Sequence, residues 1–484
     1  MALPAEFLAR IETALPAGAI VREPEQLKTY ECDGLTGHRT LPALVVLPSS
    51  TTEVQAVVRA CHAAGIPFVA RGAGTGLSGG ALPVADGIVI SLARMDRILE
   101  LDLDSGRAVV EPGVTNLAVS AAVLGDGFYY APDPSSQQVC TIGGNVAENS
   151  GGAHCLKYGF TVNHVTALEV VLPDGELVEL GGEGLDQPGP DLLGAFVGSE
   201  GTLGIATRIT LRLLRRPEAV RTLLAGFPST DAAGAAVSGI VAAGILPAAV
   251  EMMDRLTIEA AEAAVHPGYP DAGAVLIVEL DGATAQVEED LESVLELCRD
   301  AGAEEIRVAA DDAERALLWK GRKAAFAAMG RVAANYYVQD GVVPRTKLPA
   351  VLRRISELEG EFGLRVGNVF HAGDGNLHPL VLYDERNAGE AERAQLLAER
   401  ILEACVDAGG SITGEHGVGS DKACSMPLLF GPDDLEAMQR LRRAFDPDGL
   451  ANPGKIFPTP RLCGEVPGPY RAHPLERAGL AERF

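Results

Sequence analysis

Two histidines on either side of an Asp-Gly dipeptide are the residues whose types and spacing point most directly to chemistry. His371 and His378 flank Asp374-Gly375 within NVFHAGDGNLHPLVL, residues 368–382. Asp-Gly is favoured in two-residue type I′ turns, so we predict a hairpin in which His371 lies directly opposite His378. Cross-strand partners share one face with Cβ atoms about 4.5–5.5 Å apart, and two such imidazoles can bind one metal ion at about 2.0–2.1 Å. The alternative is a structural role, which is usual for a lone strand histidine.

A mononuclear metal site needs a further ligand, and the stretch SITGEHGVG at residues 411–419 offers Glu415 and His416 between glycines. Glu415 would complete a set of two histidines and one carboxylate, with positions left open for a substrate. His416 would then lie beside the metal, where it could act as a general base. The alternative is a capped helix start with a solvent-exposed Glu-His pair. Zinc, manganese and iron all accept this ligand set, so the sequence leaves the metal undecided.

A glycine-rich stretch earlier in the chain, FVARGAGTGLSGG at residues 68–80, is expected to bind a phosphate group. It follows a short apolar run that is typical of a strand, and its glycines allow positive φ and close approach of a ligand. Successive backbone N–H groups in such a loop form an anion-binding concavity. An ordinary flexible surface loop is the alternative.

Two common phosphate-binding motifs do not fit this stretch. A Walker loop ends in Gly-Lys-Ser/Thr, and residues 68–80 contain no lysine. A dinucleotide fingerprint is formally present at Gly74, Gly76 and Gly79. That fingerprint must open a helix, whereas the following residues 87–92, GIVISL, are typical of a strand. We therefore predict a strand–loop–strand pyrophosphate cradle.

Two further glycine-rich segments follow, APDPSSQQVCTIGGNVAENSGG at residues 131–152 and FVGSEGTLGI at residues 196–205. Each is a weak signal alone, but the order of the three segments resembles the FAD domain of the vanillyl-alcohol oxidase/p-cresol methylhydroxylase (PCMH) family. The resemblance implies an α+β fold: a PCMH-type FAD-binding domain of two α+β subdomains, with a ferredoxin-like α+β cap domain.

The same resemblance assigns roles to residues of these segments. It implies that the pyrophosphate is cradled by Arg71, Gly72, Ala73, Gly74, Thr75, Gly76, Leu77 and Ser78. It implies that the isoalloxazine and ribityl are flanked by Pro132, Thr141, Gly144, Ser150 and Gly151, with Glu200 and Ile205 near the adenine side. Covalent members of the family attach flavin through a histidine or another side chain in or near these loops. Residues 69–80 contain no histidine, cysteine or tyrosine, so we expect non-covalently bound FAD.

The composition is typical of a compact protein of two or three domains. The 484 residues are 47% hydrophobic and 22% charged, with a net charge of −26. This charge argues against nucleic acid as a partner and against docking on anionic lipid. The charge-free stretch 232–250 contains glycines and a proline and leads into Glu251-Met-Met-Asp254. We therefore predict a buried helix followed by a strand, and no membrane span.

The eight cysteines are scattered without a C-x-x-C pair, so they offer no iron–sulfur ligand set. They are typical of buried thiols in a reducing compartment. The N-terminal residues 6–15 have the pattern of an amphipathic helix instead of a secretory signal. We expect a cytoplasmic protein that is at most peripherally attached to the inner face of the cell membrane.

The composition shifts after Pro217, where a second domain is expected to begin. Strands are predicted at 222–227 and 274–280 and helices at 231–244 and 284–301, an alternation that resembles the ferredoxin-like cap. In the first domain, strands are predicted at 44–47, 87–92, 98–103, 107–111, 167–172, 177–180 and 206–214. One helix is predicted to start within residues 48–53, with a capping box from Ser50 to Glu53, and to run to Ala64; another is predicted at 114–124. The expected domains are an FAD-binding domain at 1–218 (core about 40–218), a cap and substrate domain with the metal site at 219–440, and a returning segment at 441–484. In the family, Asn452 and Lys455 make this return.

Together with the flavin loops, HAGDGNLH at 371–378 and GEHGVG at 414–419 resemble the FAD-linked D-2-hydroxyacid dehydrogenases. The ending FDPDGLANPGKIFP at 445–458 resembles that of the FAD-linked subunits of bacterial glycolate oxidases. The resemblance implies oxidation of glycolate, and D-lactate as well, to glyoxylate and pyruvate, with hydride transfer to flavin N5. In this scheme the metal at His371, His378 and Glu415 binds the 2-hydroxyl, His416 takes its proton, and Arg322 binds the carboxylate.

The resemblance also implies partners, namely an iron–sulfur subunit and a second flavin-domain-like subunit. The alternatives are a stand-alone D-lactate dehydrogenase with a cytochrome or quinone acceptor, another D-2-hydroxyacid dehydrogenase, and a non-catalytic flavin-binding or metal-storage subunit. Relatives that oxidise D-2-hydroxyglutarate are expected to carry lysine and asparagine where this chain has Val338 and Leu380, which favours a short monocarboxylate. The sequence leaves open the preference between glycolate and D-lactate, the electron acceptor and the oligomeric state.

Overall fold

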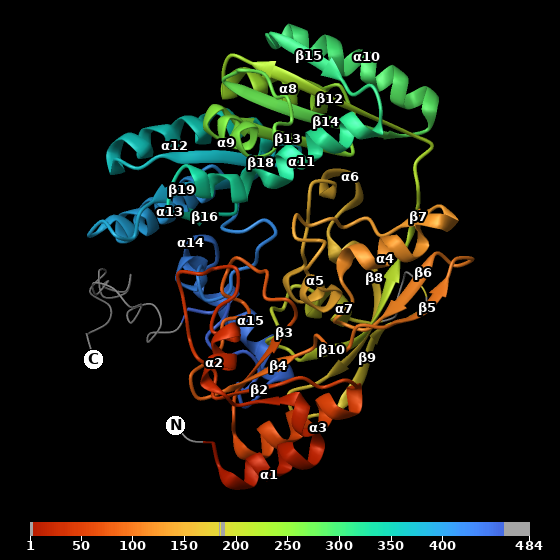
Figure 1. Cartoon of the computed structure of the whole chain (residues 1–484), viewed down its shortest axis with the longest axis vertical. Helices are drawn as coiled ribbons and strands as arrows, with labels where there is room; N and C mark the ends of the chain where they lie inside the picture. Colours follow the sequence, from red (N-terminus) through yellow and green to blue (C-terminus); the bar gives the residue numbers. More distant parts are fainter. Residues whose placement is uncertain (1–2, 183, 185–188, 459–484) are drawn as a thin grey trace. The chain divides into compact units, whose positions relative to one another are not determined.

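The computed structural model describes residues 3–182, 184 and 189–458, and the chain divides into two compact units (Figure 1). The first unit is drawn from Met1–Ser150, Phe160–Arg215 and Glu415–Phe484, and the second from Gly151–Gly159 and Arg216–Gly414. This division differs in three places from the domains expected from the sequence. The second unit resumes at Arg216 instead of residue 219, the returning segment begins at Glu415 instead of residue 441, and residues 151–159 belong to the second unit.

The first unit contains a four-stranded sheet in the order β1-β2-β4-β3. Its strands are β1 (Ile20–Val21), β2 (Leu44–Val46), β3 (Phe68–Arg71) and β4 (Ile88–Ser91). Strand β4 runs parallel to both β2 and β3. The glycine-rich loop therefore connects two parallel neighbours without a helix between them, so the strand–loop–strand prediction is confirmed and a dinucleotide-binding turn is excluded.

Helix α3 (Thr51–Ala64) follows β2, as predicted, and packs its buried valines into the same core as these strands. Ser50 caps the helix by accepting a hydrogen bond from the Glu53 N–H at 3.3 Å, and Gly65 ends it with a φ of 62°. The reciprocal half of a capping box is displaced by one residue. The Glu53 carboxylate accepts the N–H of Ser49 at 2.6 Å instead of that of Ser50.

A second, antiparallel sheet of the first unit has the order β5-β6-β10-β8-β9. Its strands are β5 (Ile98–Asp102), β6 (Arg107–Val110), β8 (Val165–Val171), β9 (Leu177–Gly181) and β10 (Ile205–Arg212), with β7 (Phe128–Tyr129) and β11 (Leu214–Arg215) forming a separate pair. The predicted hairpin at 98–111 is the β5–β6 pair. The other α-helices of this unit are α1 (Ala5–Ala14), α2 (Pro24–Leu27), α4 (Asn116–Val123), α5 (Ile142–Glu148), α7 (Leu192–Phe196), α14 (Met426–Leu429) and α15 (Pro432–Phe445).

The C-terminal part of the described chain returns to the edge of the first sheet. The Phe68 N–H donates to the carbonyl of Leu450 at 2.9 Å, and the Asn452 N–H donates to the carbonyl of Phe68 at 2.8 Å. Lys455 Nζ donates to the carbonyl of Leu82 at 2.9 Å, at the end of the glycine-rich loop. The first unit is therefore built from early residues of the chain together with residues 450–455.

The second unit is built on a sheet in the order β15-β12-β14-β13-β18-β19-β16, with β17 paired to β19. The strands are β12 (Ala219–Phe227), β13 (Ala249–Asp254), β14 (Ala274–Gly282), β15 (Glu305–Val308), β16 (Asn335–Val338), β17 (Gly341–Val342), β18 (Val366–His371) and β19 (Asn376–Tyr383). The helices are α6 (Cys155–Tyr158), α8 (Thr230–Ala242), α9 (Arg255–Val265), α10 (Thr284–Asp300), α11 (Asp312–Ala328), α12 (Leu348–Phe362) and α13 (Glu390–Asp407). The succession β12-α8-β13-β14-α10-β15 is the βαββαβ order of ferredoxin-like folds, with α9 inserted after β13.

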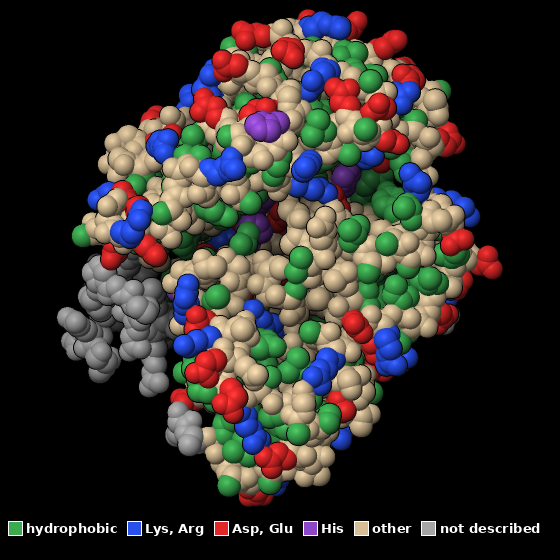
Figure 2. Space-filling view, viewed as in Figure 1, with side chains coloured by type: hydrophobic (Ala, Val, Ile, Leu, Met, Phe, Trp, Pro, Cys, Tyr) green, Lys and Arg blue, Asp and Glu red, His purple; other side chains and the backbone are tan. Residues whose placement is uncertain are grey.

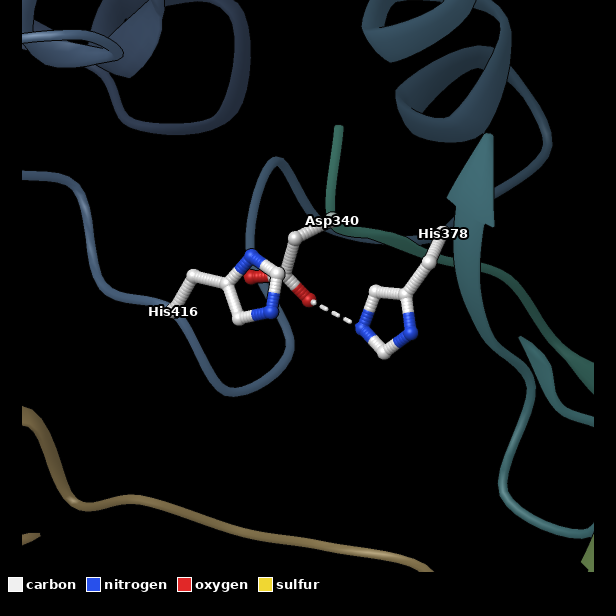
Figure 3. A group of neighbouring side chains, drawn as sticks. All are labelled: Asp340, His378 and His416. Carbon is white, nitrogen blue, oxygen red and sulfur yellow. Dashed lines mark ion pairs between the residues drawn. The ribbon is translucent and has the colours of Figure 1, made fainter. Parts of the chain in front are cut away.

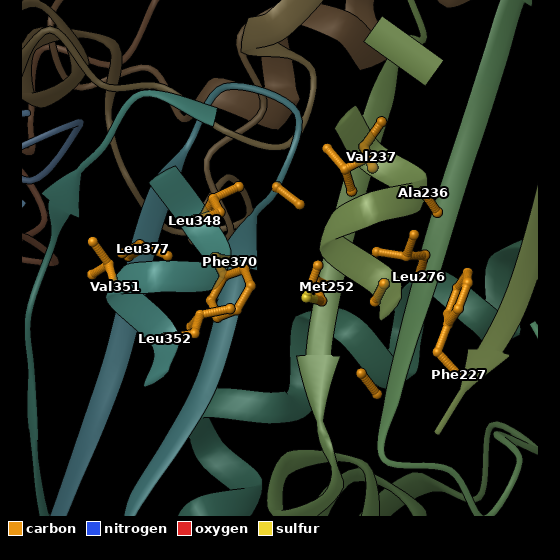
Figure 4. Packing of buried hydrophobic residues seen from close by; sticks show 14 of the residues in the cluster. Phe227, Ala236, Val237, Met252, Leu276, Leu348, Val351, Leu352, Phe370 and Leu377 are labelled. Atoms are coloured by element: carbon orange, nitrogen blue, oxygen red, sulfur yellow. The ribbon is translucent and has the colours of Figure 1, made fainter. Parts of the chain in front are cut away.

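The two faces of this sheet differ in chemistry. One face packs with α8, α10, α12 and α13 into one apolar core, which includes Met252, Leu276 and Phe370 (Figure 4). Successive side chains alternate across a strand, so the neighbours of these residues, among them Glu251 and His371, point to the opposite face. That second face, called the polar sheet face below, carries the chemistry-bearing residues of this unit.

No helix within the described residues is long and apolar enough to cross a membrane. The charge-free stretch 232–250 begins in α8 and ends in the first residues of β13, so the predicted helix followed by a strand is confirmed. On the side of the molecule drawn in Figure 2, acidic and basic side chains are interspersed among polar and apolar ones.

Candidate functional site

The β18–β19 hairpin brings His371 and His378 close together, but not in the predicted register. His371 pairs with Asn376, and His378 pairs with Val369. The connecting turn therefore contains four residues, 372–375, instead of two. The prediction that His371 lies directly opposite His378 is wrong.

The wider turn forms because Gly375, with a φ of 83°, folds back onto the strand. Its N–H donates to the carbonyl of His371 at 3.1 Å, and the Asp374 carboxylate accepts the N–H of Asn376 at 3.1 Å. A Cβ on Gly375 would lie 2.1 Å from the carbonyl oxygen of Val343, so a side chain has no room there. The register differs from the predicted one by two residues, an even number, so both histidines still share the polar sheet face. Their ring centroids are 5.1 Å apart.

A buried carboxylate that sequence analysis did not select, Glu251 on β13, joins His371 to Arg322. Glu251 is directly opposite His371 in the sheet, and its Oε1 lies 2.7 Å from His371 Nδ1. Its Oε2 lies 2.6 Å from Nη2 of Arg322 on α11. Both side chains of this ion pair are almost fully removed from water, so each charge depends on the other. The available signal was one acidic residue within the apolar run AAVEMM, residues 248–253.

A second buried carboxylate, Glu279 on β14, anchors helix α11 to the polar sheet face. Arg315 Nε and Trp319 Nε1 donate to Glu279 Oε2 at 2.8 and 2.7 Å. With Arg322, these residues recur at spacings of four and three and so share one face of the helix. Burial raises the pKa of Glu279, but hydrogen bonds from Arg315 and His154 outweigh it and hold that pKa well below its usual range.

Asp340, also missed by sequence analysis, connects His378 to the loop that follows α13. Its Oδ1 lies 3.6 Å from His378 Nε2 (Figure 3). Its Oδ2 accepts hydrogen bonds from Thr413 Oγ1 at 2.6 Å and from the Gly414 N–H at 3.0 Å. Asp340 is fully buried, and the two hydrogen bonds that it accepts hold this loop in place up to Gly414.

Glu415 and His416 follow the anchored Gly414 directly, so the chain itself keeps them near Asp340. Two overlapping groups of possible metal ligands include them: Asp340, His378 and His416 in one, and His371, His378 and Glu415 in the other. In each group the ligand atoms lie within 4.8 Å of one another. Imidazole nitrogens and carboxylate oxygens suit zinc, manganese or iron, so the residues fit a divalent ion. The ion itself stays a prediction.

In the first unit, the backbone of the glycine-rich loop has the features of an anion site. Within the described residues, the N–H groups of residues 73–78 donate no hydrogen bond to the protein. The Ser78 hydroxyl is buried and likewise has no hydrogen-bond partner there. Gly74 and Gly79 have φ values of 69° and 77°, the left-handed conformation that lets successive N–H groups face one anion. These donors fit a pyrophosphate, such as that of the expected FAD.

Arg71, predicted to bind the pyrophosphate, packs against the loop itself. Its Nη1 donates to the carbonyl of Ala81 at 3.4 Å, and its guanidinium lies 5.7 Å from the ring centre of Tyr30. A Cβ on Gly74 would lie 2.2 Å from this guanidinium. Burial lowers the pKa of Arg71. The side chain therefore supports the loop conformation.

The other residues predicted to contact flavin occupy defined places in the fold. Thr141 caps α5 by accepting the Gly144 N–H at 3.3 Å, and its hydroxyl fills the space that a Cβ on Gly72 would need. The carbonyls of Pro132 and Ser150 accept hydrogen bonds from Asn116 and Thr161. Gly151 begins a segment of the second unit, and Ile205 is buried at the start of β10.

Glu200, predicted to lie near the adenine, uses its carboxylate to hold the segment after His416. Its two oxygens accept the N–H groups of Val418 and Gly419, each at 2.7 Å. Its carbonyl accepts a hydrogen bond from Asn452 Nδ2 at 2.6 Å, and its own φ is 53°. Burial raises the pKa of Glu200, although these backbone hydrogen bonds oppose the shift.

Glu148, at the end of α5, is a buried carboxyl beside the glycine-rich loop that sequence analysis did not select. Its Oε2 has no hydrogen-bond partner within the described residues. A Cβ on Gly80 would lie 2.4 Å from its Oε1, so the glycine makes room for the carboxyl. Burial, and then the nearby Glu200 carboxylate, raise the pKa of Glu148 well above its usual value.

Comparison with known proteins identifies the family of this chain. Residues 42–181 match the FAD binding domain family, and residues 216–456 match the family of FAD linked oxidases, C-terminal domain. Glycolate oxidase subunit GlcD of Escherichia coli (strain K12) is 52% identical over 93% of this chain and 91% of its own length. A D-lactate dehydrogenase of Anaerostipes hadrus is 34% identical over 86% of this chain and 89% of its own.

A solved structure of p-cresol methylhydroxylase with substrate bound shares the fold, with a TM-score of 0.77 and 19% identity over 94% of this chain and 97% of that one. This confirms the predicted α+β architecture of a PCMH-type FAD-binding protein. With GlcD and the D-lactate dehydrogenase matched over most of their lengths, the chain belongs to the family of FAD-linked oxidases that includes glycolate oxidase subunit GlcD.

Proposed function

We propose that this protein is an FAD-dependent D-2-hydroxyacid dehydrogenase that oxidises glycolate to glyoxylate and D-lactate to pyruvate. The observation that carries the proposal is the match to GlcD over nearly the whole chain. The polar sheet face supports it, because a buried arginine, two histidines and the adjoining Glu415-His416 pair offer both an anchor and a base for a hydroxyacid.

Arg322 is the residue assigned to the substrate carboxylate. Its Nε is buried and donates no hydrogen bond within the part of the chain that the structure describes. A guanidinium suits a carboxylate because its N–H groups can bind both oxygens. Glu251 holds Nη2 of the same group, which fixes the direction of the free donor.

His416 is the proposed general base, which accepts the proton of the 2-hydroxyl on an imidazole nitrogen. The hydrogen on C2 then leaves with its electron pair, and a 2-oxoacid results. When bound, FAD supplies the acceptor for this hydride. A divalent ion held by His371, His378 and Glu415 would supply a Lewis acid. FAD itself is proposed to be held non-covalently at the glycine-rich loop.

Two apolar residues support a preference for short monocarboxylates. Val338 and Leu380 are directly opposite each other on β16 and β19, and both are buried. Leu380 lies two residues beyond His378 and therefore shares its face. A second carboxylate placed against these side chains would lose its hydration without gaining a partner.

Anaerobic addition of glycolate or D-lactate to the purified flavoprotein tests this function. Each should bleach the visible flavin absorbance, whereas D-2-hydroxyglutarate should not. The Arg322→Lys variant should bleach at much higher substrate concentration, because one ammonium does not replace a guanidinium fork. A flavin that no 2-hydroxyacid reduces would favour a non-catalytic subunit.

The electron acceptor is proposed to be an iron–sulfur partner, within an assembly that also contains a second flavin-domain-like subunit. The support is that the relative GlcD is named as a subunit. Any attachment to a membrane would then run through these partners. The isolated chain should pass electrons poorly to quinone until the iron–sulfur partner is added. Rapid quinone reduction by the isolated chain would favour a stand-alone D-lactate dehydrogenase, a function to which the 34% identical relative points.

A further inference from the structure

Glu251 is buried on the polar sheet face and divides its carboxylate between two residues with different tasks. Its side chain is 0% exposed. Oε1 lies 2.7 Å from His371 Nδ1, and Oε2 lies 2.6 Å from Arg322 Nη2. One acidic residue therefore contacts both a proposed metal ligand and the proposed substrate arginine.

The fold determines both contacts. Strands β13 and β18 are antiparallel neighbours, and their register puts Glu251 directly opposite His371. Such partners have Cβ atoms about 4.5–5.5 Å apart, so the longer glutamate side chain reaches the imidazole without strain. Helix α11 brings Arg322 over the same face, where the second oxygen meets it.

The contact with His371 has a chemical consequence. A carboxylate accepts hydrogen bonds, so Nδ1 must carry the proton, and the lone pair of the ring is then on Nε2. Carboxylates that hold the second nitrogen of a metal-binding histidine fix its tautomer and orientation, and raise its basicity.

We infer that Glu251 is a positioning residue that presents His371 Nε2 to a divalent metal and, through its other oxygen, holds Arg322 for the substrate carboxylate. The inference rests on the proposed function, because it takes His371 as a metal ligand. Metal affinity and substrate affinity thereby depend on one carboxylate that touches neither the metal ion nor the substrate.

Glu279 provides a matched control for this carboxylate. It lies on the neighbouring strand β14, is 2% exposed, and shares the polar sheet face because Glu251 pairs with Ile277, two residues away. It also binds an arginine of α11, Arg315. Within the described residues, the Glu279 carboxylate contacts His154, Thr222, Arg315 and Trp319 instead of His371 or Arg322.

The test compares Glu251→Gln, Glu251→Ala and Glu279→Gln in the full-length, FAD-loaded protein, with Zn²⁺ and Mn²⁺ as probes in competition with a chelator. Glu251→Ala should weaken metal binding about 10–100-fold, the usual effect of removing such a partner. Glu251→Gln should weaken it less, because its amide oxygen can still accept from Nδ1–H. Glu279→Gln should bind metal as the wild type does. Flavin content reports whether each variant folds. If Glu251→Ala does not fold, Glu251→Gln carries the test, because glutamine has the same shape as glutamate.

Two further readouts separate positioning from a general structural effect. The visible spectrum of the Co²⁺-loaded protein should change in Glu251→Gln and not in Glu279→Gln. KM for glycolate should rise more in the Glu251 variants than in Glu279→Gln, because Glu279 reaches Arg322 only through helix α11. Wild-type metal affinity in Glu251→Gln and Glu251→Ala, or an equal loss in Glu279→Gln, would overturn the inference. If glycolate reduces the flavin of the wild-type protein but this protein binds neither Zn²⁺ nor Mn²⁺, the metal part of the proposed function is overturned instead.

Discussion

The glycine-rich loop of the first unit and the polar sheet face of the second unit offer binding groups of opposite kinds. The loop offers backbone N–H groups from consecutive residues, 73–78, and needs glycine where φ is positive, at Gly74 and Gly79. The sheet face offers side chains from several strands and a helix, and buried carboxylates hold them in place. His371 and Glu251, for example, are 120 residues apart in the chain. A backbone site thus depends on local φ values, whereas a side-chain site depends on strand pairing.

Removing a proposed metal ligand should have the largest effect and should separate the two sites. His378→Ala and Glu415→Gln should abolish turnover, since a ligand lost from a set of three costs most of the metal affinity. FAD should remain bound at its wild-type level, because the loop lies in another part of the chain. Metal analysis and flavin absorbance of the same samples measure both. Full metal occupancy in both variants would refute the ligand set.

Removing the proposed general base should have the next largest effect. His416→Gln should lower kcat by about 10²–10⁴-fold, the range typical of a positioned proton acceptor. Flavin content and metal content should change little. Stopped-flow measurement of flavin reduction by glycolate gives the rate of the affected step. Unchanged reduction rates would show that another group takes the hydroxyl proton.

One glycine from each region tests whether the two sites depend on different backbone turns. Gly74 and Gly375 both have positive φ, and a Cβ at either would meet an atom at 2.2 or 2.1 Å. An alanine at each position should destabilise its region by about 1–3 kcal/mol. Gly74→Ala should lose FAD and keep metal, while Gly375→Ala should lose metal and keep FAD. Loss of both ligands in both variants would mean that the regions are not separable.

Glu148→Gln should give the smallest effect, seen as a change in pH dependence. Folding raises the pKa of this carboxyl. The protonated carboxyl therefore contributes stability that is fully present below its pKa in the unfolded chain, and this contribution is lost as pH rises through its pKa in the folded protein. The amide cannot ionise. Glu148→Gln should therefore gain in melting temperature over the wild type as pH rises, with a constant difference at acid pH. Parallel melting curves at all pH values would show that Glu148 titrates normally.

Local patterns in the sequence predicted much of this protein. The cap at Ser50, the glycine loop between two strands, the 98–111 hairpin and the alternation of strands and helices after Pro217 follow from residues that are close together in the chain. Propensity, capping and glycine content act over a few residues, so they can be read without knowing the fold. The family resemblance rested on the same local motifs.

The hairpin register was predicted wrongly because the turn is decided by its surroundings. Asp-Gly favours a two-residue turn in isolation. Here the Gly375 backbone packs against Val343, a residue from another part of the sheet, and the turn widens to four residues. An error of two residues leaves both histidines on the same face of the sheet. They are therefore neighbours, as predicted, although the register is wrong.

The sequence by itself determined which residue types are available for chemistry: glycines for a backbone anion site, and histidines, an arginine and carboxylates for the proposed hydroxyacid site. Only the tertiary structure decided which carboxylates support them. Glu251, Glu279 and Asp340 lie in different segments and carry no local motif. Their roles arise when sheet order and helix docking bring them to buried positions beside His371, Arg315 and His378. The physical reason is that a buried charge must find a partner in space, and that partner is not its neighbour in sequence.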